Sequence, residues 1–201
     1  MLQLLLILII IMQAADVLCC PVQALNDRTW RPATYQGLTI GKSTRSDMLR
    51  VLGKPLSSGP SADQDPPYPI IWNEYGRIAG DTPGTLAVEV DSRNNRIVSI
   101  SVSPDRMTRE EAIKLFGDDY LLMGYQFCKG LPPEADVGPV YEDPKSSEID
   151  YLEYRNRGIA IHLDYQGMVN SIYYVAEPIG LSSKAGCRKA LERYRRKSKR
   201  R

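Results

Sequence analysis

The sequence predicts an α+β fold of two tandem units, in which each unit packs one short helix on a small antiparallel β-sheet. Three observations predict it: a gapless internal repeat, a helix-start signal in each copy, and alternating apolar runs after each copy. The repeat aligns residues 44–53 with residues 108–117 and matches Thr, Arg, an acidic residue, the apolar positions and a closing Gly. The chain has 201 residues, 43% of them hydrophobic, which is enough to bury cores of this size.

The start and the end of each copy carry helix-boundary signals. Thr44 and Thr108 are each followed three residues later by an acidic residue, the capping-box pattern that satisfies free N–H groups at a helix start. Each copy closes on a glycine, Gly53 or Gly117, a residue suited to the left-handed position just past a helix. The apolar residues between these signals leave a polar strip, so we expect two short helices that each bury one side.

Three strand-like runs follow each helix, after a Pro-rich loop. The last two runs of each copy alternate between apolar and other residues and are separated by turn residues, which is typical of β-hairpins. The matched runs are 71–75 and 150–154, which share Glu-Tyr, 86–91 and 159–164, and 97–102 and 169–175. We therefore place a linker at 25–35, a first unit at 36–103, a second unit at 104–181 and a basic tail at 182–201.

The first 24 residues predict a secretory signal peptide. Residues 4–12 form an apolar stretch that is too short for a membrane-spanning helix, which needs about 20 residues. Val22 and Ala24 supply the small residues that signal peptidase reads, so we expect cleavage and export to the periplasm, the outer membrane or the medium. Because no basic residue precedes the apolar stretch, an uncleaved anchor and a misassigned start stay open, as does lipidation at Cys19 or Cys20.

Two cysteines, Cys128 and Cys187, remain after the predicted cleavage. An even pair in an oxidising compartment suggests a disulfide. Two separate buried thiols are the alternative, since two cysteines do not make a framework and the sequence does not supply their separation.

Charge is distributed unevenly along the mature chain. Residues 25–183 carry 16 basic and 22 acidic residues, whereas residues 184–201 carry ten basic residues and one acidic residue. We expect a short helix with Cys187, Leu191 and Tyr194 on one stripe, followed by a disordered basic end. Such a tail would bind anionic lipid or fold back on the acidic body. The candidate membrane-binding residues are Arg188, Lys189, Arg193, Arg195, Arg196 and Lys197.

Residues 41–55, together with residues 72–75 and the hairpin that starts at Leu86, resemble the SmpA/OmlA (BamE) outer-membrane assembly lipoproteins. That family has a G-x-[ST] start, a short helix ending in L-G-x-P, and three strands. The resemblance covers about residues 36–103; the second copy departs from it, because Gly117-Asp-Asp replaces the L-G-x-P ending. The tandem arrangement is similar to that of β-lactamase inhibitor proteins, whose two units form one concave surface. The resemblance implies protein binding in the cell envelope, with outer-membrane protein assembly as the closest specific role.

Strand alternation assigns candidate partner-binding residues to the sheet face away from the helices. If the apolar residues of the hairpins point toward the helices, the intervening side chains point outward. In the hairpins these are Glu89, Ser99, Ser101, His162 and Tyr173.

The first strand of each copy adds further candidates. Trp72 and Glu74, like Tyr151 and Glu153, share one parity, and if it is outward they join the same face. Aromatic residues on an open face favour a protein-binding patch. The alternative, with Trp72 and Tyr151 in the core and Asn73 outward, stays open because the register of these strands is not fixed by sequence.

Signals for catalysis are absent from the sequence. It contains one histidine, His162, and neither a P-loop pattern nor a G-x-S-x-G nucleophile pattern. We therefore expect no catalytic residue, no metal site, no cofactor and, for an exported chain, no nucleic-acid partner. The predicted function is a non-enzymatic cell-envelope protein-binding module. The alternatives are a secreted inhibitor of an enzyme and a peripheral protein that binds anionic membranes through its basic tail.

Overall fold

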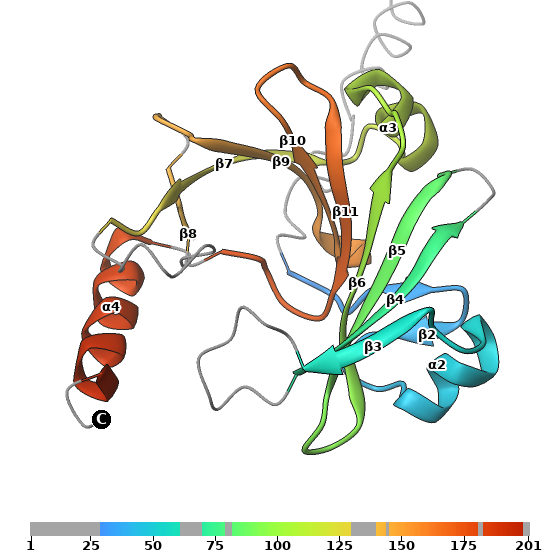
Figure 1. Ribbon diagram of the computed structural model, residues 1–201. Helices are drawn as coiled ribbons and strands as arrows, with labels where there is room; N and C mark the ends of the chain where they lie inside the picture. Colours follow the sequence, from blue (N-terminus) through green and yellow to red (C-terminus); the bar gives the residue numbers. More distant parts are fainter. Residues whose placement is uncertain are drawn as a thin grey trace, which may run out of the picture.

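The computed structural model describes residues 29–60, 70–78, 82–129, 140–143, 145–180 and 183–198. The predicted signal peptide at 1–24, with Cys19 and Cys20, lies outside these residues. The fold is mostly β, with one large antiparallel sheet, one small hairpin and three α-helices in the described part of the chain (Figure 1).

The large sheet has nine strands in the order β3-β4-β5-β6-β11-β10-β9-β7-β8, and all neighbouring strands are antiparallel. The strands are β3 (Ser57–Pro60), β4 (Ile70–Ile78), β5 (Gly84–Asp91), β6 (Arg96–Pro104), β7 (Leu121–Phe127), β8 (Val140–Glu142), β9 (Ile149–Tyr154), β10 (Ile159–Leu163) and β11 (Val169–Val175).

The prediction of two small sheets, one in each of two tandem units, is wrong. β6 and β11, the last strands of the two sequence copies, pair with each other, so the two expected sheets are one. Ser101 lies opposite Tyr173, and Val102 lies opposite Ile172. The physical reason is that each small sheet would end in a strand with unpaired backbone N–H and C=O groups. Pairing β6 with β11 gives the groups on both strand edges hydrogen-bond partners. The expected boundary between residues 103 and 104 falls within β6.

The two short helices form where the capping boxes predict them. α2 (Arg45–Leu52) and α3 (Arg109–Phe116) each begin after a threonine whose side chain accepts a backbone N–H. Gly53 and Gly117 follow at φ of 80° and 92°, in a region that favours glycine. Met48 of α2 and Ala112 of α3 are fully buried in the same core, so both helices cover the same face of the sheet.

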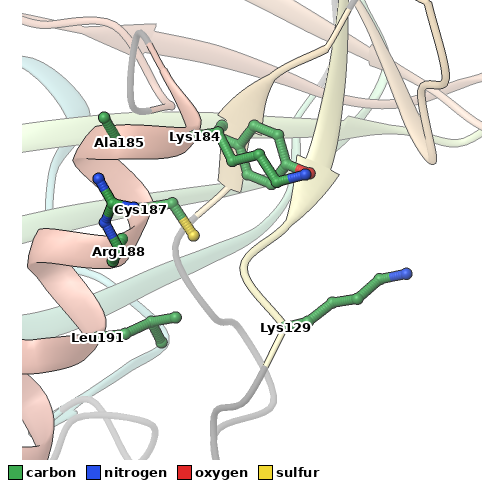
Figure 2. Close-up of a pocket in the computed structure, with 7 residues that line it drawn as sticks. Lys129, Lys184, Ala185, Cys187, Arg188 and Leu191 are labelled. Carbon is green, nitrogen blue, oxygen red and sulfur yellow. The ribbon is translucent and has the colours of Figure 1, made fainter.

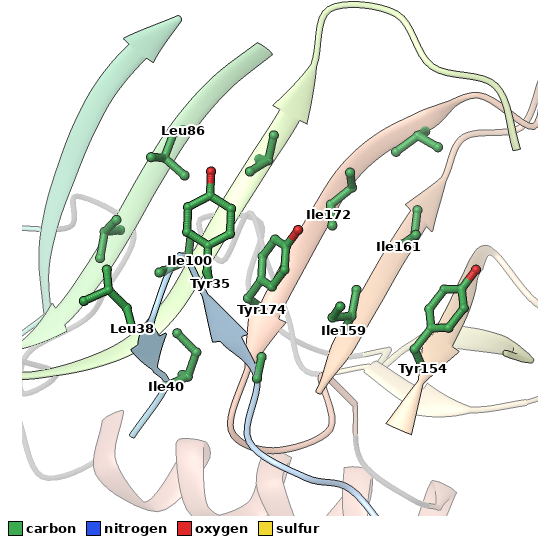
Figure 3. Close-up of a cluster of buried hydrophobic side chains, with 14 of the residues drawn as sticks. Tyr35, Leu38, Ile40, Leu86, Ile100, Tyr154, Ile159, Ile161, Ile172 and Tyr174 are labelled. Atoms are coloured by element: carbon green, nitrogen blue, oxygen red, sulfur yellow. The ribbon is translucent and has the colours of Figure 1, made fainter. Parts of the chain in front are cut away.

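A hairpin near the N-terminus completes that core. β1 (Thr34–Tyr35) pairs with β2 (Leu38–Thr39), and the ring of Tyr35 lies 4.9 Å from that of Tyr174. Figure 3 shows Tyr35, Leu38 and Ile40 among the buried side chains of the sheet. Strands of two residues have no detectable period, so this hairpin has no signal in the sequence.

The sequence repeat is reproduced in tertiary contacts. The cap residue Thr44 forms a β-bridge with Arg96, as Thr108 does with Met168. The tyrosine of each shared Glu-Tyr pair donates a hydrogen bond to the glycine carbonyl after its helix. Tyr75 donates to Gly53 at 3.1 Å and Tyr154 to Gly117 at 2.8 Å. These contacts tie each helix end to its strand.

The second half has elements without a counterpart in the first. β7 and β8 extend the sheet beyond β9, and the short 3-10 helix η2 (Arg155–Arg157) leads from β9 toward β10. The C-terminal helix α4 (Lys184–Ser198) stands beside β8, at the far end of the sheet from α2 (Figure 1). The basic end expected to be disordered is therefore helical as far as Ser198. Of the helices in the described ranges, none combines the length and apolar character needed to cross a bilayer.

Candidate functional site

The nine predicted partner-binding residues all lie on the sheet face opposite α2 and α3, here called the open face. Residues paired across neighbouring strands share a face. One row runs through Trp72, Glu89 and Ser99; a second runs through Glu74, Ser101, Tyr173 and Glu153; a third contains Tyr151 and His162. The alternative for β4 is excluded, because Asn73 is buried on the helix side and donates to the carbonyl of Val88 at 3.2 Å.

The first half of the open face is accessible. Trp72 is 37% exposed and Glu74 is exposed, while Glu89, Ser99 and Ser101 are half-buried. Short polar contacts order this surface. Ser99 donates a hydrogen bond to Glu89 at 2.6 Å and Ser57 donates to Glu74 at 3.2 Å. An aromatic ring flanked by oriented carboxylates is therefore presented to solvent.

The second half of the open face is largely covered. Tyr151 is 6% exposed and Glu153 is fully buried, so these two predicted partner-binding side chains are not accessible on this face. Tyr151 packs in a cluster with other apolar side chains from the N-terminal segment, from β8 and β9 and from the segment after β11. These are Trp30, Val140, Ile149 and Ile179. Alternation placed the two residues on one shared face, but it left open which face that is and carries no information about what covers it.

Glu153 belongs to a buried ionic network at the centre of the second half. Tyr125 of β7 donates a hydrogen bond to one carboxylate oxygen, and Arg155 donates to the other at 2.7 Å. Arg155 also lies 3.4 Å from a carboxylate oxygen of Glu142. Burial and then the hydrogen bond to Glu153 raise the pKa of Tyr125 above its ordinary value. Because the buried charges are paired, the network supports the fold by joining β7, β8 and β9.

His162 belongs to an aromatic cluster with Tyr125, Tyr151 and Tyr173. Its ring stacks on that of Tyr151 at 5.0 Å between centroids, and Tyr151 lies 5.5 Å from Tyr125 and 6.4 Å from Tyr173. The Nδ1 atom of His162 lies 3.2 Å from the side-chain nitrogen of Asn170. Burial lowers the pKa of His162, and the nearby Asp164 opposes this shift. His162 and Tyr173 are half-buried and form the exposed margin of the cluster.

The cysteines and the basic tail meet at the opposite end of the sheet from β3. Cys128 and Cys187 form a disulfide, so the alternative of two separate thiols does not hold. The side chains of Arg188, Lys189, Arg195 and Arg196 are exposed on α4. The side chains of Arg193 and Lys197, also predicted to bind membranes, are not among those that the structure describes.

Neither a search for metal-ligand groups nor a comparison with known proteins assigns a function to this chain. In the ranges that the structure describes, no group of three or more His, Cys, Asp or Glu side chains is placed to hold a metal ion. The resemblance of residues 36–103 to the outer-membrane assembly lipoproteins stays a prediction. Comparison with protein-family models, with curated proteins and with solved structures finds no match to this chain.

Proposed function

We propose that this protein is a non-enzymatic binding module whose open face contacts a protein partner. The observation that carries the proposal is the accessible half of that face, where Trp72 shares the face with Glu74 and with Glu89, its partner on β5, while α2 and α3 pack on the other face. Trp and Tyr are the side chains that contribute most to protein interfaces. Tyr173 of β11 lies opposite Ser101 of β6 and extends the same surface.

The chemistry of the face specifies the kind of partner. Glu74 and Glu89 present negative charge, and residues 25–183 as a whole carry six more acidic than basic residues. A complementary partner offers an apolar socket for the indole ring of Trp72 and basic side chains around it. The single histidine stacks on Tyr151, which supports a role in packing rather than in proton transfer.

The cell envelope is the location that we propose for this partner. Two features of the sequence support it: the signal-like residues 1–24 and the resemblance of residues 36–103 to outer-membrane assembly lipoproteins. Assistance in outer-membrane protein assembly is the specific role that we propose, and inhibition of a secreted enzyme is its competitor.

Photo-cross-linking from the open face tests the proposal. A photoreactive phenylalanine analogue replaces Trp72 in the full-length, C-terminally tagged chain, expressed in the organism that produces it. The matched control places the same analogue at Tyr165, an aromatic residue that is 94% exposed in the turn between β10 and β11, away from this face. We expect a protein adduct from position 72 and none from position 165. Identical adducts from both positions, or none from either, contradict the proposal.

The identity of the captured protein separates the candidate roles. An outer-membrane assembly component supports the assembly role, and a soluble enzyme supports the inhibitor role. Trp72→Ala should then weaken binding of that partner by about tenfold or more, because aromatic hot spots contribute at least about 2 kcal/mol. Tyr165→Ala should leave the affinity unchanged.

Binding to anionic membranes through α4 is a second candidate function. The observation that favours it is that exposed Arg188 and Arg196 lie on one helix, which the disulfide attaches to the body at Cys187. Each basic residue near an anionic surface contributes about 1 kcal/mol. A chain that ends at Cys187 retains the disulfide but loses the rest of the helix. The intact chain should sediment with phosphatidylglycerol vesicles and the shortened chain should not; equal sedimentation contradicts this function.

A further inference from the structure

A cavity of about 460 Å³ lies between the start of α4 and the end of the sheet at β8. Its walls come from α4, from β8 and from Lys129, just after β7. Figure 2 shows Lys184, Cys187 and Leu191 projecting from one side of α4 toward the segment that carries Lys129. We call this cavity the basic pocket.

Among the described residues that line the basic pocket, three are cations and none is a carboxylate. Lys129, Lys184 and Arg188 make no ion pair and no side-chain hydrogen bond with any part of the chain that the structure describes. By contrast, Arg50, Arg155 and Arg157 each form an ion pair with a carboxylate. Like charges that line one cavity repel one another, and a bound anion reduces this repulsion.

The other described residues that line the pocket are mostly apolar. Cys128, Tyr141 and Cys187 are buried together, and Leu191 packs against them. The hydroxyl of Tyr141 makes no hydrogen bond with the described residues, so it can donate to a bound group. Cationic side chains beside apolar side chains in one pocket suit a ligand that has an anionic group and an apolar portion.

The disulfide positions two of the three cations. Lys129 directly follows Cys128 and Arg188 directly follows Cys187, so the bond between the two sulfur atoms holds both cations at the same cavity. Lys184 and Arg188 lie one helical turn apart on α4, and both line the cavity. A covalent link and a helix therefore restrict where the three cations lie around it.

We propose that the basic pocket binds a phosphate group, carried either by a lipid headgroup or by a soluble phosphate compound. A soluble phosphate monoester carries about −1.5 to −2 charges near neutral pH, and the phosphodiester of a lipid such as phosphatidylglycerol carries a single negative charge, so both complement the cations of the pocket. Arginine binds phosphate oxygens in a bidentate manner and lysine binds them as a point charge. The volume lies within the range of small-molecule sites, about 300–1,000 Å³. The proposal does not depend on the open face.

Charge-matched variants of the full chain test the proposal. Arg188→Gln and Lys129→Gln each remove a cation from the pocket. Arg196→Gln removes the same charge from an exposed position of α4 that does not line the pocket. The probes are inorganic phosphate, followed by calorimetry, and phosphatidylcholine vesicles with and without phosphatidylglycerol, followed by sedimentation. Thermal melting of each variant verifies that it is folded, and Lys184→Gln replaces any variant that is not.

Two patterns of results support the proposal and identify the source of the phosphate. Binding of inorganic phosphate that both pocket variants weaken by about tenfold or more, while Arg196→Gln changes it less than about twofold, indicates a soluble phosphate ligand. The same selective loss with phosphatidylglycerol vesicles alone indicates a lipid headgroup. Incubation of the wild-type chain with a reductant should weaken binding as the pocket variants do.

Two other patterns overturn the proposal. If the three substitutions weaken vesicle binding equally, α4 acts through its total charge and the pocket has no specific role, although membrane binding itself stands. If the wild-type chain binds neither inorganic phosphate nor phosphatidylglycerol vesicles, the pocket is not a phosphate site. Neither result bears on the partner of the open face.

Discussion

The two halves of the sheet share their local contacts but differ in what covers their open face. Position for position in the repeat, Trp72 and Glu74 of β4 correspond to Tyr151 and Glu153 of β9. The first pair is exposed, whereas the second pair is buried, with Tyr151 in the cluster that Trp30 packs against. The same Glu-Tyr sequence therefore produces a surface carboxylate in one half and a buried ion pair in the other.

The difference arises from the strands beyond each Glu-Tyr pair. β4 is followed in the sheet only by the four residues of β3, whereas β9 is followed by β7 and β8. Those added strands supply Tyr125 and Glu142, the partners that the buried network of Glu153 and Arg155 requires. A carboxylate can be buried where such partners exist and stays in water where they do not.

The largest expected effect contrasts the two glutamates. Glu153→Ala should destabilise the fold by about 3–5 kcal/mol, because it leaves Arg155 and Tyr125 without their buried partner. Glu74→Ala, at the corresponding exposed position, should change stability by less than about 0.5 kcal/mol. Urea unfolding of both variants measures the contrast. Equal losses would show that the burial of Glu153 has no energetic consequence.

Reduction of the disulfide should have the next largest effect and should act on the second half. The bond between Cys128 and Cys187 joins residues 59 apart in sequence, and a native disulfide typically contributes about 2–4 kcal/mol. Thermal melting with and without reductant measures the loss. Hydrogen exchange should locate it at α4 and β8, with α2 and β4 unchanged; an unchanged melting temperature contradicts this expectation.

The two tyrosines that bind the glycine carbonyls provide a smaller and more closely matched contrast. Tyr154→Phe should cost about 1–3 kcal/mol, because Tyr154 is fully buried and its loss leaves the carbonyl of Gly117 without this donor. Tyr75→Phe should cost less, since water can replace its more exposed contact with Gly53. Chemical denaturation of both variants measures their losses of stability. A larger loss for Tyr75→Phe than for Tyr154→Phe contradicts the expectation.

The smallest effect concerns pH and is confined to the second half. Burial holds the pKa of His162 below its ordinary value of 6.5, so the unfolded chain takes up the proton first as the pH falls. The stability that this residue contributes is present above pH 6.5 and is lost below it. His162→Gln should flatten this part of the pH profile, while Glu89→Gln, at the corresponding position of the first half, should not. Denaturation midpoints between neutral and mildly acidic pH provide the measurement.

Local features of this fold could be predicted from sequence because local patterns determine them. The capping boxes located α2 and α3, and strand alternation placed Ser101 and Tyr173 on the same face. The pairing of β6 with β11 could not be predicted, since alternation leaves every hairpin strand equally able to pair with another. This pairing turned the expected α+β tandem units into one sheet.

The candidate sites show the same limit. Whether Tyr151 is exposed depends on Trp30, more than a hundred residues earlier, and no period links the two. The basic pocket needs Lys129 beside Arg188, which becomes apparent only once their neighbouring cysteines are known to be bonded. Residues brought together by distant segments require the three-dimensional structure.

The two ends of the nine-stranded sheet bear on the solubility of the protein. β3 is short and ends at Pro60, which has no N–H to offer a further strand, and β8 has only three residues and lies against α4. Long unpaired strands are templates for aggregation, and short ones interrupted by proline are poor templates. Because the disulfide keeps α4 against β8, it also limits the addition of a strand from another molecule at the β8 edge of the sheet. Oligomers that form in reducing conditions should therefore join through β8 before the rest of the fold opens.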